Sequence, residues 1–141
     1  MIDIENYVIT TIKSALAATF PSAAVYGVYI EAPSVFPCVC IVEDDNYTYT
    51  PSQDNDLVEH HANVMYSVNV YSNKKTGAKE EAKAIFDVVD LALQDMKFTR
   101  KVRSQIPNVD RTIYRVVGRY SAVVQEPQIE GGNTVYQIYR K

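Results

Sequence analysis

The apolar residues between positions 78 and 96 follow the period of an α-helix. They recur at steps of three and four, and the set is Ala78, Ala82, Ile85, Phe86, Val89, Leu93 and Met96. Charged residues, Asp87 and Asp90 among them, lie off this stripe. Because such a helix is stable only when its apolar face is buried, the spacing predicts a helix over 77–96 that packs against a sheet formed by the rest of the chain.

A second helix is predicted at 3–19, where Ile4, Val8 and Ile12 begin another stripe with helical spacing. Asp3 is expected to cap this helix. Phe20-Pro21 should end it, because the residue before a proline avoids the helical conformation.

Segments rich in β-branched and aromatic residues predict the strands, at 24–30, 38–42, 62–72, 98–103, 111–125 and 134–139. The strand at 38–42 is apolar on both faces and is expected to be central and to stop at Glu43. Gly118 marks a candidate bulge, and 130–133 reads as a hairpin turn. The order α-β-β-β-α-β-β-β predicts a single α+β domain over 1–141, with a mostly antiparallel sheet and two helices packed on one face.

Residues 45–58 are polar and rich in turn-forming side chains. They predict a projecting loop or hairpin, mobile in a free subunit and ordered on assembly. Tyr47 and Tyr49 would offer contact area to a partner, because tyrosine combines an apolar ring with a polar hydroxyl.

Charge is divided unevenly along the chain. Residues 1–73 carry nine acids and one base (−8), residues 74–96 carry four bases and five acids (−1), and residues 97–141 carry nine bases and three acids (+6). A sequence pI near 5.3 argues against sequence-specific nucleic-acid binding as the main activity. Opposite charge in the two halves instead suits self-association or two different protein neighbours.

Other broad classes are disfavoured by local sequence. The longest apolar runs, such as 35–42, fall short of the ~20 residues that span a bilayer, and the acidic N-terminus is unlike a secretory signal. We therefore expect no membrane partner and synthesis in the cytoplasm. Cys38 and Cys40, two strand positions and roughly 6.5–7 Å apart, are expected to be thiols in the core.

No catalytic motif is visible, since the chain lacks a Gly-x-Ser-x-Gly elbow, a glycine-rich phosphate loop and a His-Glu-x-x-His helix. No enzymatic activity, cofactor or metal is expected. Glu59, His60 and His61 are ligand types suited to a divalent metal, although successive strand side chains point to opposite faces. A small metal-dependent enzyme built on these three residues remains an alternative.

Arg111, Arg115 and Arg119 recur every fourth residue in the long late strand, which places them on one face of it. Such a row could hold phosphate, pair with carboxylates of another chain, or solvate the open side of a sheet.

Several segments together resemble the tail terminator, or tail completion, proteins of long-tailed bacteriophages and phage-tail-like particles. They are the N-terminal helix, the run Pro-Ser-Val-Phe-Pro-Cys-Val-Cys-Ile-Val-Glu-Asp at 33–44, the strand 66–72 leading into 77–86, and the strand 114–120. The resemblance covers nearly the whole chain and rests on a pattern of elements.

The resemblance implies a structural virion protein of the tail–neck region, made in the bacterial host cytoplasm and without enzymatic activity or cofactor. Its subunits would form a ring, commonly a hexamer, that caps the head-proximal end of the tail tube. The implied partners are other copies of the chain, the tail tube protein, the head-completion or neck connector protein and, where the tail is contractile, the tail sheath. Another phage neck (head–tail joining) protein and a dimeric ferredoxin-like small-molecule binder are further alternatives.

A ring needs a head-to-tail contact between two different patches. The acidic middle of the chain and its basic late strands predict such a pair. The expected interface residues are Asp44, Asp45, Tyr47, Tyr49, Lys101, Arg103, Arg111, Arg115 and Arg119.

Overall fold

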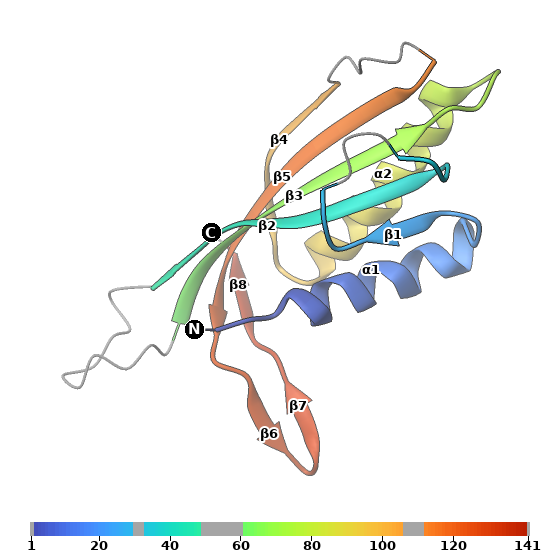
Figure 1. Ribbon diagram of the computed structural model, residues 1–141. Helices are drawn as coiled ribbons and strands as arrows, with labels where there is room; N and C mark the ends of the chain where they lie inside the picture. Colours follow the sequence, from blue (N-terminus) through green and yellow to red (C-terminus); the bar gives the residue numbers. More distant parts are fainter. Residues whose placement is uncertain (1, 30–32, 49–60, 106–111, 141) are drawn as a thin grey trace.

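The computed structural model describes residues 2–29, 33–48, 61–105 and 112–140 and has the predicted α+β architecture (Figure 1). Its elements are α1 (Glu5–Thr19), β1 (Ala24–Tyr26), β2 (Cys38–Thr48), β3 (His61–Ser72), α2 (Ala78–Asp95), β4 (Thr99–Gln105), β5 (Tyr114–Gln125), β6 (Gln128–Glu130), β7 (Asn133–Val135) and β8 (Ile138–Arg140). The six-stranded sheet and the two helices follow the order α-β-β-β-α-β-β-β.

The six-stranded sheet has the order β1-β2-β3-β5-β4, and β8 pairs with β5 beyond the end of β4. β1 runs parallel to β2, and the remaining pairs are antiparallel. β6 and β7 form a separate hairpin that extends away from the sheet (Figure 1). The long strands β2, β3 and β5 therefore form the centre of the molecule.

Both helices bury the apolar stripes that the sequence predicts. α1 buries Val8, Ile12 and Leu16. α2 buries Ala82, Ile85, Phe86, Val89, Ala92 and Leu93. Every second residue of β3, from Ala62 to Val70, belongs to the same core. Neither helix is long and apolar enough to cross a membrane.

One expectation about the helices is wrong in detail. Asp3 lies before α1, whose N-cap position is Ile4, although its carboxylate does accept a hydrogen bond from the Glu5 N–H at 3.0 Å. Asp90 lies off the apolar stripe of α2 but is buried, because it accepts hydrogen bonds from β4 and β5 side chains described below.

β2 does not stop at Glu43 but continues to Thr48, paired with β3 throughout. The register of this pairing shifts between Glu43 and Asp45, so that Asp44 has no paired residue in β3. The polar segment predicted at 45–58 thus begins as strand, and residues 49–60 lie outside the described part. The polar composition of this segment does not prevent a strand. Asp44 and Asp45 are exposed, so placing them in a strand costs little free energy.

The C-terminal third also differs from the prediction in its boundaries. The strand expected at 134–139 is divided between β7 and β8, and β1 ends at Tyr26 rather than at 30. The hairpin turn is confirmed, since Gly131 and Gly132 adopt φ angles of 57° and 83°.

Gly118 is a close-packing position rather than a bulge. β5 pairs with β3 without interruption through Gly118, and the irregularity lies in β4, between Arg100 and Val102. Gly118 faces α2, where an added Cβ would lie 2.6 Å from Cζ of Phe86. The glycine is therefore required by the approach of the Phe86 ring.

We predict that Gly118→Ala lowers the free energy of unfolding by about 1–3 kcal/mol, because overpacking forces the Phe86 ring out of place. Urea denaturation measures the loss. The same substitution should cost less when Phe86 is already leucine, and an alanine variant as stable as the wild type would contradict the packing argument.

Candidate functional site: the outer face and edges of the sheet

One face of the sheet is turned away from both helices, and we call it the outer face. Because side chains alternate along a strand, it is formed by the residues between the core positions. In β3 these are Asn63, Met65, Ser67, Asn69 and Tyr71, and in β5 they are Arg115, Val117, Arg119, Ser121 and Val123. On the two central strands, β3 and β5, the outer face thus carries polar and basic side chains among apolar ones.

Arg115 is held in place by neighbours within the subunit. Its Nε and Nη2 donate hydrogen bonds to Oδ1 of Asn69 at 3.1 and 2.7 Å. Its guanidinium also lies 5.5 Å from the ring centroid of Tyr71 and 5.6 Å from that of Tyr29. These hydrogen bonds and cation–π contacts hold the side chain in place, so Arg115 is partly used inside the subunit.

Arg119 is exposed on the same face, as the four-residue spacing predicts. It lies directly opposite Ser67 in the β3–β5 pairing. Arg111, the third member of the predicted row, lies outside the described residues.

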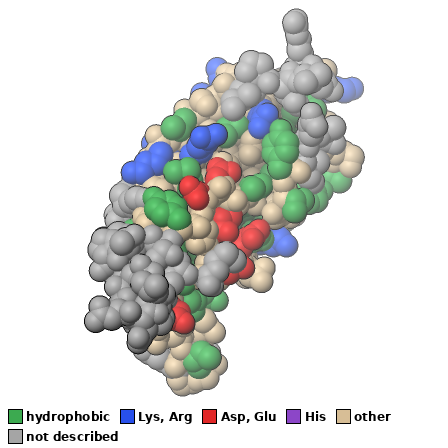
Figure 2. Space-filling view, turned by 60° about the vertical axis from the view of Figure 1, so that its left-hand side comes forward, with side chains coloured by type: hydrophobic (Ala, Val, Ile, Leu, Met, Phe, Trp, Pro, Cys, Tyr) green, Lys and Arg blue, Asp and Glu red, His purple; other side chains and the backbone are tan. Residues whose placement is uncertain are grey.

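Asp44 lies on the other side of Ser67. At the register shift of β2 it accepts a hydrogen bond from the Ser67 hydroxyl. The structure therefore brings Asp44 and Arg119 close to one another on the outer face, although the sequence places them in opposite halves of the chain. Figure 2 shows acidic and basic side chains in adjacent areas of one face of the molecule.

The other expected interface residues lie toward two edges of the sheet. Asp45 and Tyr47 are exposed on β2, Tyr47 to 49%. Lys101 is exposed at the irregularity of β4, and the guanidinium of Arg103 lies 5.0 Å above the Phe86 ring. Val102, between them, is 50% exposed. Tyr49 lies outside the described residues.

Cys38 and Cys40 are buried thiols, as predicted. They pack with Tyr71 and with the loop residue Phe36 at the β1 end of the sheet. A hydrogen bond with the Cys40 thiol, together with burial, raises the pKa of Cys38. Both cysteines therefore act as small core residues.

Glu43 occupies a partly buried position between β2 and the start of α1. Its Oε1 accepts hydrogen bonds from the Tyr66 hydroxyl at 3.1 Å and from Nδ2 of Asn46 at 3.2 Å. Burial raises the pKa of Glu43, the two hydrogen bonds lower it, and the nearby carboxylates of Asp3 and Glu5 raise it further. The net result is a raised pKa, so the ionised form is disfavoured in the folded protein.

We predict that, from acidic to neutral pH, the free energy of unfolding of the wild type falls relative to that of the Glu43→Gln variant. A carboxyl whose pKa is raised on folding contributes stability below its unfolded pKa of about 4.3, and this contribution is lost as the pH rises through the folded pKa. Urea denaturation of both proteins at several pH values checks the sign. Relative to the glutamine variant, the wild type should become less stable from pH 4 toward pH 7, and an opposite trend would contradict the assignment.

The predicted metal-ligand run is only partly described. His61 is the first residue of β3, with its ring centroid 5.8 Å from that of Tyr139, whereas Glu59 and His60 lie outside the described residues. Across the described ranges, no group of three or more His, Cys, Asp or Glu side chains is placed to hold a metal ion.

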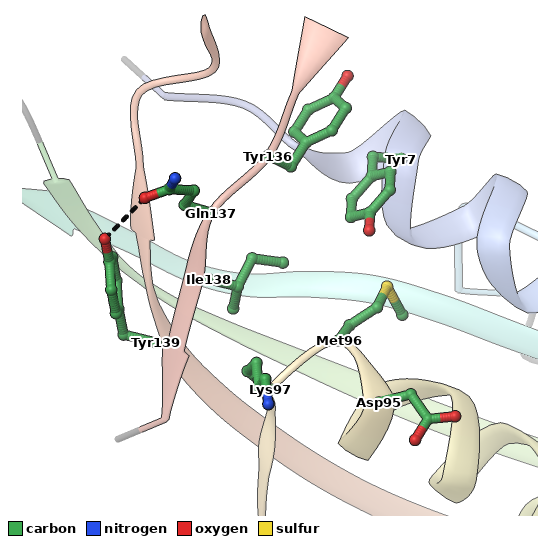
Figure 3. A pocket seen from close by; sticks show the side chains of 8 residues that line it. All are labelled: Tyr7, Asp95, Met96, Lys97, Tyr136, Gln137, Ile138 and Tyr139. Carbon is green, nitrogen blue, oxygen red and sulfur yellow. Dashed lines mark hydrogen bonds between the residues drawn. The ribbon is translucent and has the colours of Figure 1, made fainter.

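Two of the hollows among the described residues are lined in part by α1. One of about 530 Å³ runs between α1 and α2, beside the exposed Leu91. The other, of about 370 Å³, lies where the C-terminal segment meets α1 and the end of α2 (Figure 3). There the Tyr7 and Tyr136 rings stack at 4.2 Å, which fixes the base of the β6–β7 hairpin. No local sequence pattern indicates this contact, although the chain is rich in tyrosine, with eleven residues.

Comparison of the chain with protein-family models and with curated proteins finds no match in either.

Proposed function

We propose that this chain is the ring-forming subunit of a phage-type tail terminator, which caps the head-proximal end of a tail tube. The observation that supports this most is how the resembling segments are arranged. The runs at 33–44, 66–86 and 114–120 form β2, β3 with α2, and β5, which are neighbours at the centre of the fold. The resemblance therefore concerns one contiguous structural unit.

The distribution of charge also supports a head-to-tail contact. The acidic residues Asp44 and Asp45 lie on β2, and the basic residues Lys101 and Arg103 lie on β4, at the far side of the sheet. Exposed ion pairs contribute only about 0–1 kcal/mol each, so they set orientation and rate more than affinity. The exposed side chains of Tyr47 and Val102 add apolar contact.

In this proposal the protein is a structural component of the tail–neck region, without an enzymatic activity or a cofactor. Its partners are other copies of itself, the tail tube protein, the head-completion or neck connector protein and, where the tail is contractile, the tail sheath. Another head–tail joining protein remains the main alternative, since it would also form a ring but would bind the connector rather than the tube.

Imaging of tail tubes by negative-stain electron microscopy tests the proposal. Tube protein should polymerise to long tubes alone, and addition of this chain should stop growth and leave extra density at one end of each tube. Tubes that lengthen unchanged would contradict the assignment. Binding to the connector without binding to tube ends would favour the neck-protein alternative.

Metal analysis separates the structural role from the metal-enzyme alternative. Purified protein should retain no stoichiometric zinc or manganese after dialysis, measured by elemental analysis, and His60→Ala with His61→Ala should leave assembly unchanged. A metal retained one-to-one in the wild type and lost in this variant would contradict the structural role.

A further inference from the structure

We propose that the ring closes by antiparallel pairing between the open edge of β2 in one subunit and the open edge of β4 in the next. This inference rests on the proposed ring and specifies how its subunits meet. The partner is a second copy of this chain.

The two edges lie on opposite sides of one sheet (Figure 1). β1 pairs only with Cys38–Cys40 of β2, which leaves residues 41–48 without a strand on that side in the part of the chain that the structure describes. β4 pairs with β5 and, among the described strands, with no other. Unpaired strand edges present N–H and C=O groups ready to bond to another chain.

Length and direction of the edges are compatible. The open run of β2 has eight residues (41–48), and β4 has seven. Three successive antiparallel pairings, β2 with β3, β3 with β5 and β5 with β4, make β2 and β4 antiparallel to one another. A copy rotated about an axis roughly along the strands therefore presents β2 antiparallel to β4 of its neighbour.

Charge favours the contact of β2 with β4 over a contact between two β2 edges or two β4 edges. The open run of β2 carries Asp44 and Asp45, and β4 carries Lys101 and Arg103, all exposed. Two β4 edges would place basic residues against basic ones, and two β2 edges would place acidic against acidic, both of which are destabilising. Only β2 against β4 opposes unlike charges, and this contact is head-to-tail, as a closed ring requires.

The N-terminal segment limits which residues of β2 can pair with the next subunit. Nδ2 of Asn46 donates a hydrogen bond to the Ile2 carbonyl at 2.7 Å, which places this segment beside the far end of the open run. We therefore expect pairing to centre on residues 41–45, the most acidic part of β2.

Hydrogen exchange of the assembled full-length protein, with native mass spectrometry on the same sample, tests the pairing. Amides of β4 that do not bond to β5, and amides of 41–45 that do not bond to β3, should exchange at least tenfold more slowly in the ring than unprotected amides do. A ring in which these amides exchange at the unprotected rate overturns the inference but leaves the proposed function standing. Absence of any oligomer overturns both.

Engineered cysteines give an independent test. Asp45 and Lys101 lie three strand spacings apart in one subunit, about 14 Å, which is beyond the ~7 Å limit for a disulfide. Oxidation of the double variant Asp45→Cys with Lys101→Cys should therefore link different subunits into a ladder of oligomers. Each single variant should stop at a dimer, and the control pair Lys13→Cys with Asp87→Cys, on the helices, should give no ladder.

Charge reversal tests the selectivity of the pairing. Lys101→Glu with Arg103→Glu should raise the concentration at half-assembly at least tenfold, and adding Asp44→Lys with Asp45→Lys should partly restore assembly. Lys74→Glu with Lys75→Glu changes the net charge equally at exposed positions away from both edges and should have little effect. Equal effects of both reversals would overturn the selective role of the edges.

Discussion

Val89→Asp should prevent the chain from accumulating as a folded, soluble protein. Val89 is fully buried on α2 and belongs to the same core as Val68 and Val116 of the sheet. An unpaired carboxylate at this position costs several kcal/mol, which is comparable to the 5–15 kcal/mol that stabilises a typical domain. Soluble yield and far-ultraviolet circular dichroism measure the outcome.

Leu91→Asp is the matched control on the same helix. Leu91 is 63% exposed, so the same type of replacement should leave a folded protein with a stability close to that of the wild type. A Val89→Asp protein with a normal melting curve would show that the α2 stripe is not part of the core.

Asp90→Ala should lower the free energy of unfolding by about 2–4 kcal/mol, because it removes the centre of a buried hydrogen-bond network. The Asp90 carboxylate accepts bonds from the Tyr120 hydroxyl at 2.6 Å, from Nη1 of Arg100 at 3.1 Å and from Nε2 of Gln94 at 2.7 Å. Burial and the bond to Asp90 raise the pKa of Tyr120, whose hydroxyl therefore stays protonated and would be left without its acceptor.

Urea denaturation of two further variants separates this network from a general effect on the helix. Asp90→Asn keeps an acceptor oxygen and should lose clearly less stability than the alanine variant. Asp87→Ala, at an exposed position of α2, should change stability by less than about 0.5 kcal/mol. Equal losses for Asp90→Ala and Asp87→Ala would contradict the role of the network.

The helices and the centre of the sheet could be predicted because their apolar periods are regular. The stripes of α1 and α2 and the alternation in β3 are local patterns that match what the core buries. The buried state of Asp90 could not be predicted in this way, since its partners Arg100 and Tyr120 come from strands whose position over α2 no local pattern specifies.

The edges of the fold were harder to predict for the same reason. β2 extends through an acidic run because β3 supplies its backbone partners, and that long-range pairing outweighs the low strand propensity of Asp44 and Asp45. The break between β7 and β8 also depends on long-range pairing. β8 pairs with residues 122–124 of β5, which lie beyond the end of β4 and so are open to a further strand.

The candidate site was predictable in composition but not in arrangement. The four-residue spacing correctly placed Arg115 and Arg119 on one face. The closeness of Arg119 to Asp44 follows from strand order, because β2 and β5 both pair with β3, and no local sequence pattern reveals this order.

Native mass spectrometry of the full-length protein, over a range of concentrations and at low and moderate salt, tests the ring most directly. We predict one closed oligomer, with six times the 15.9 kDa subunit mass as the expected species, that dissociates more readily as salt is raised. A monomer or a two-subunit mass at every concentration would contradict the ring, and with it the proposed terminator role.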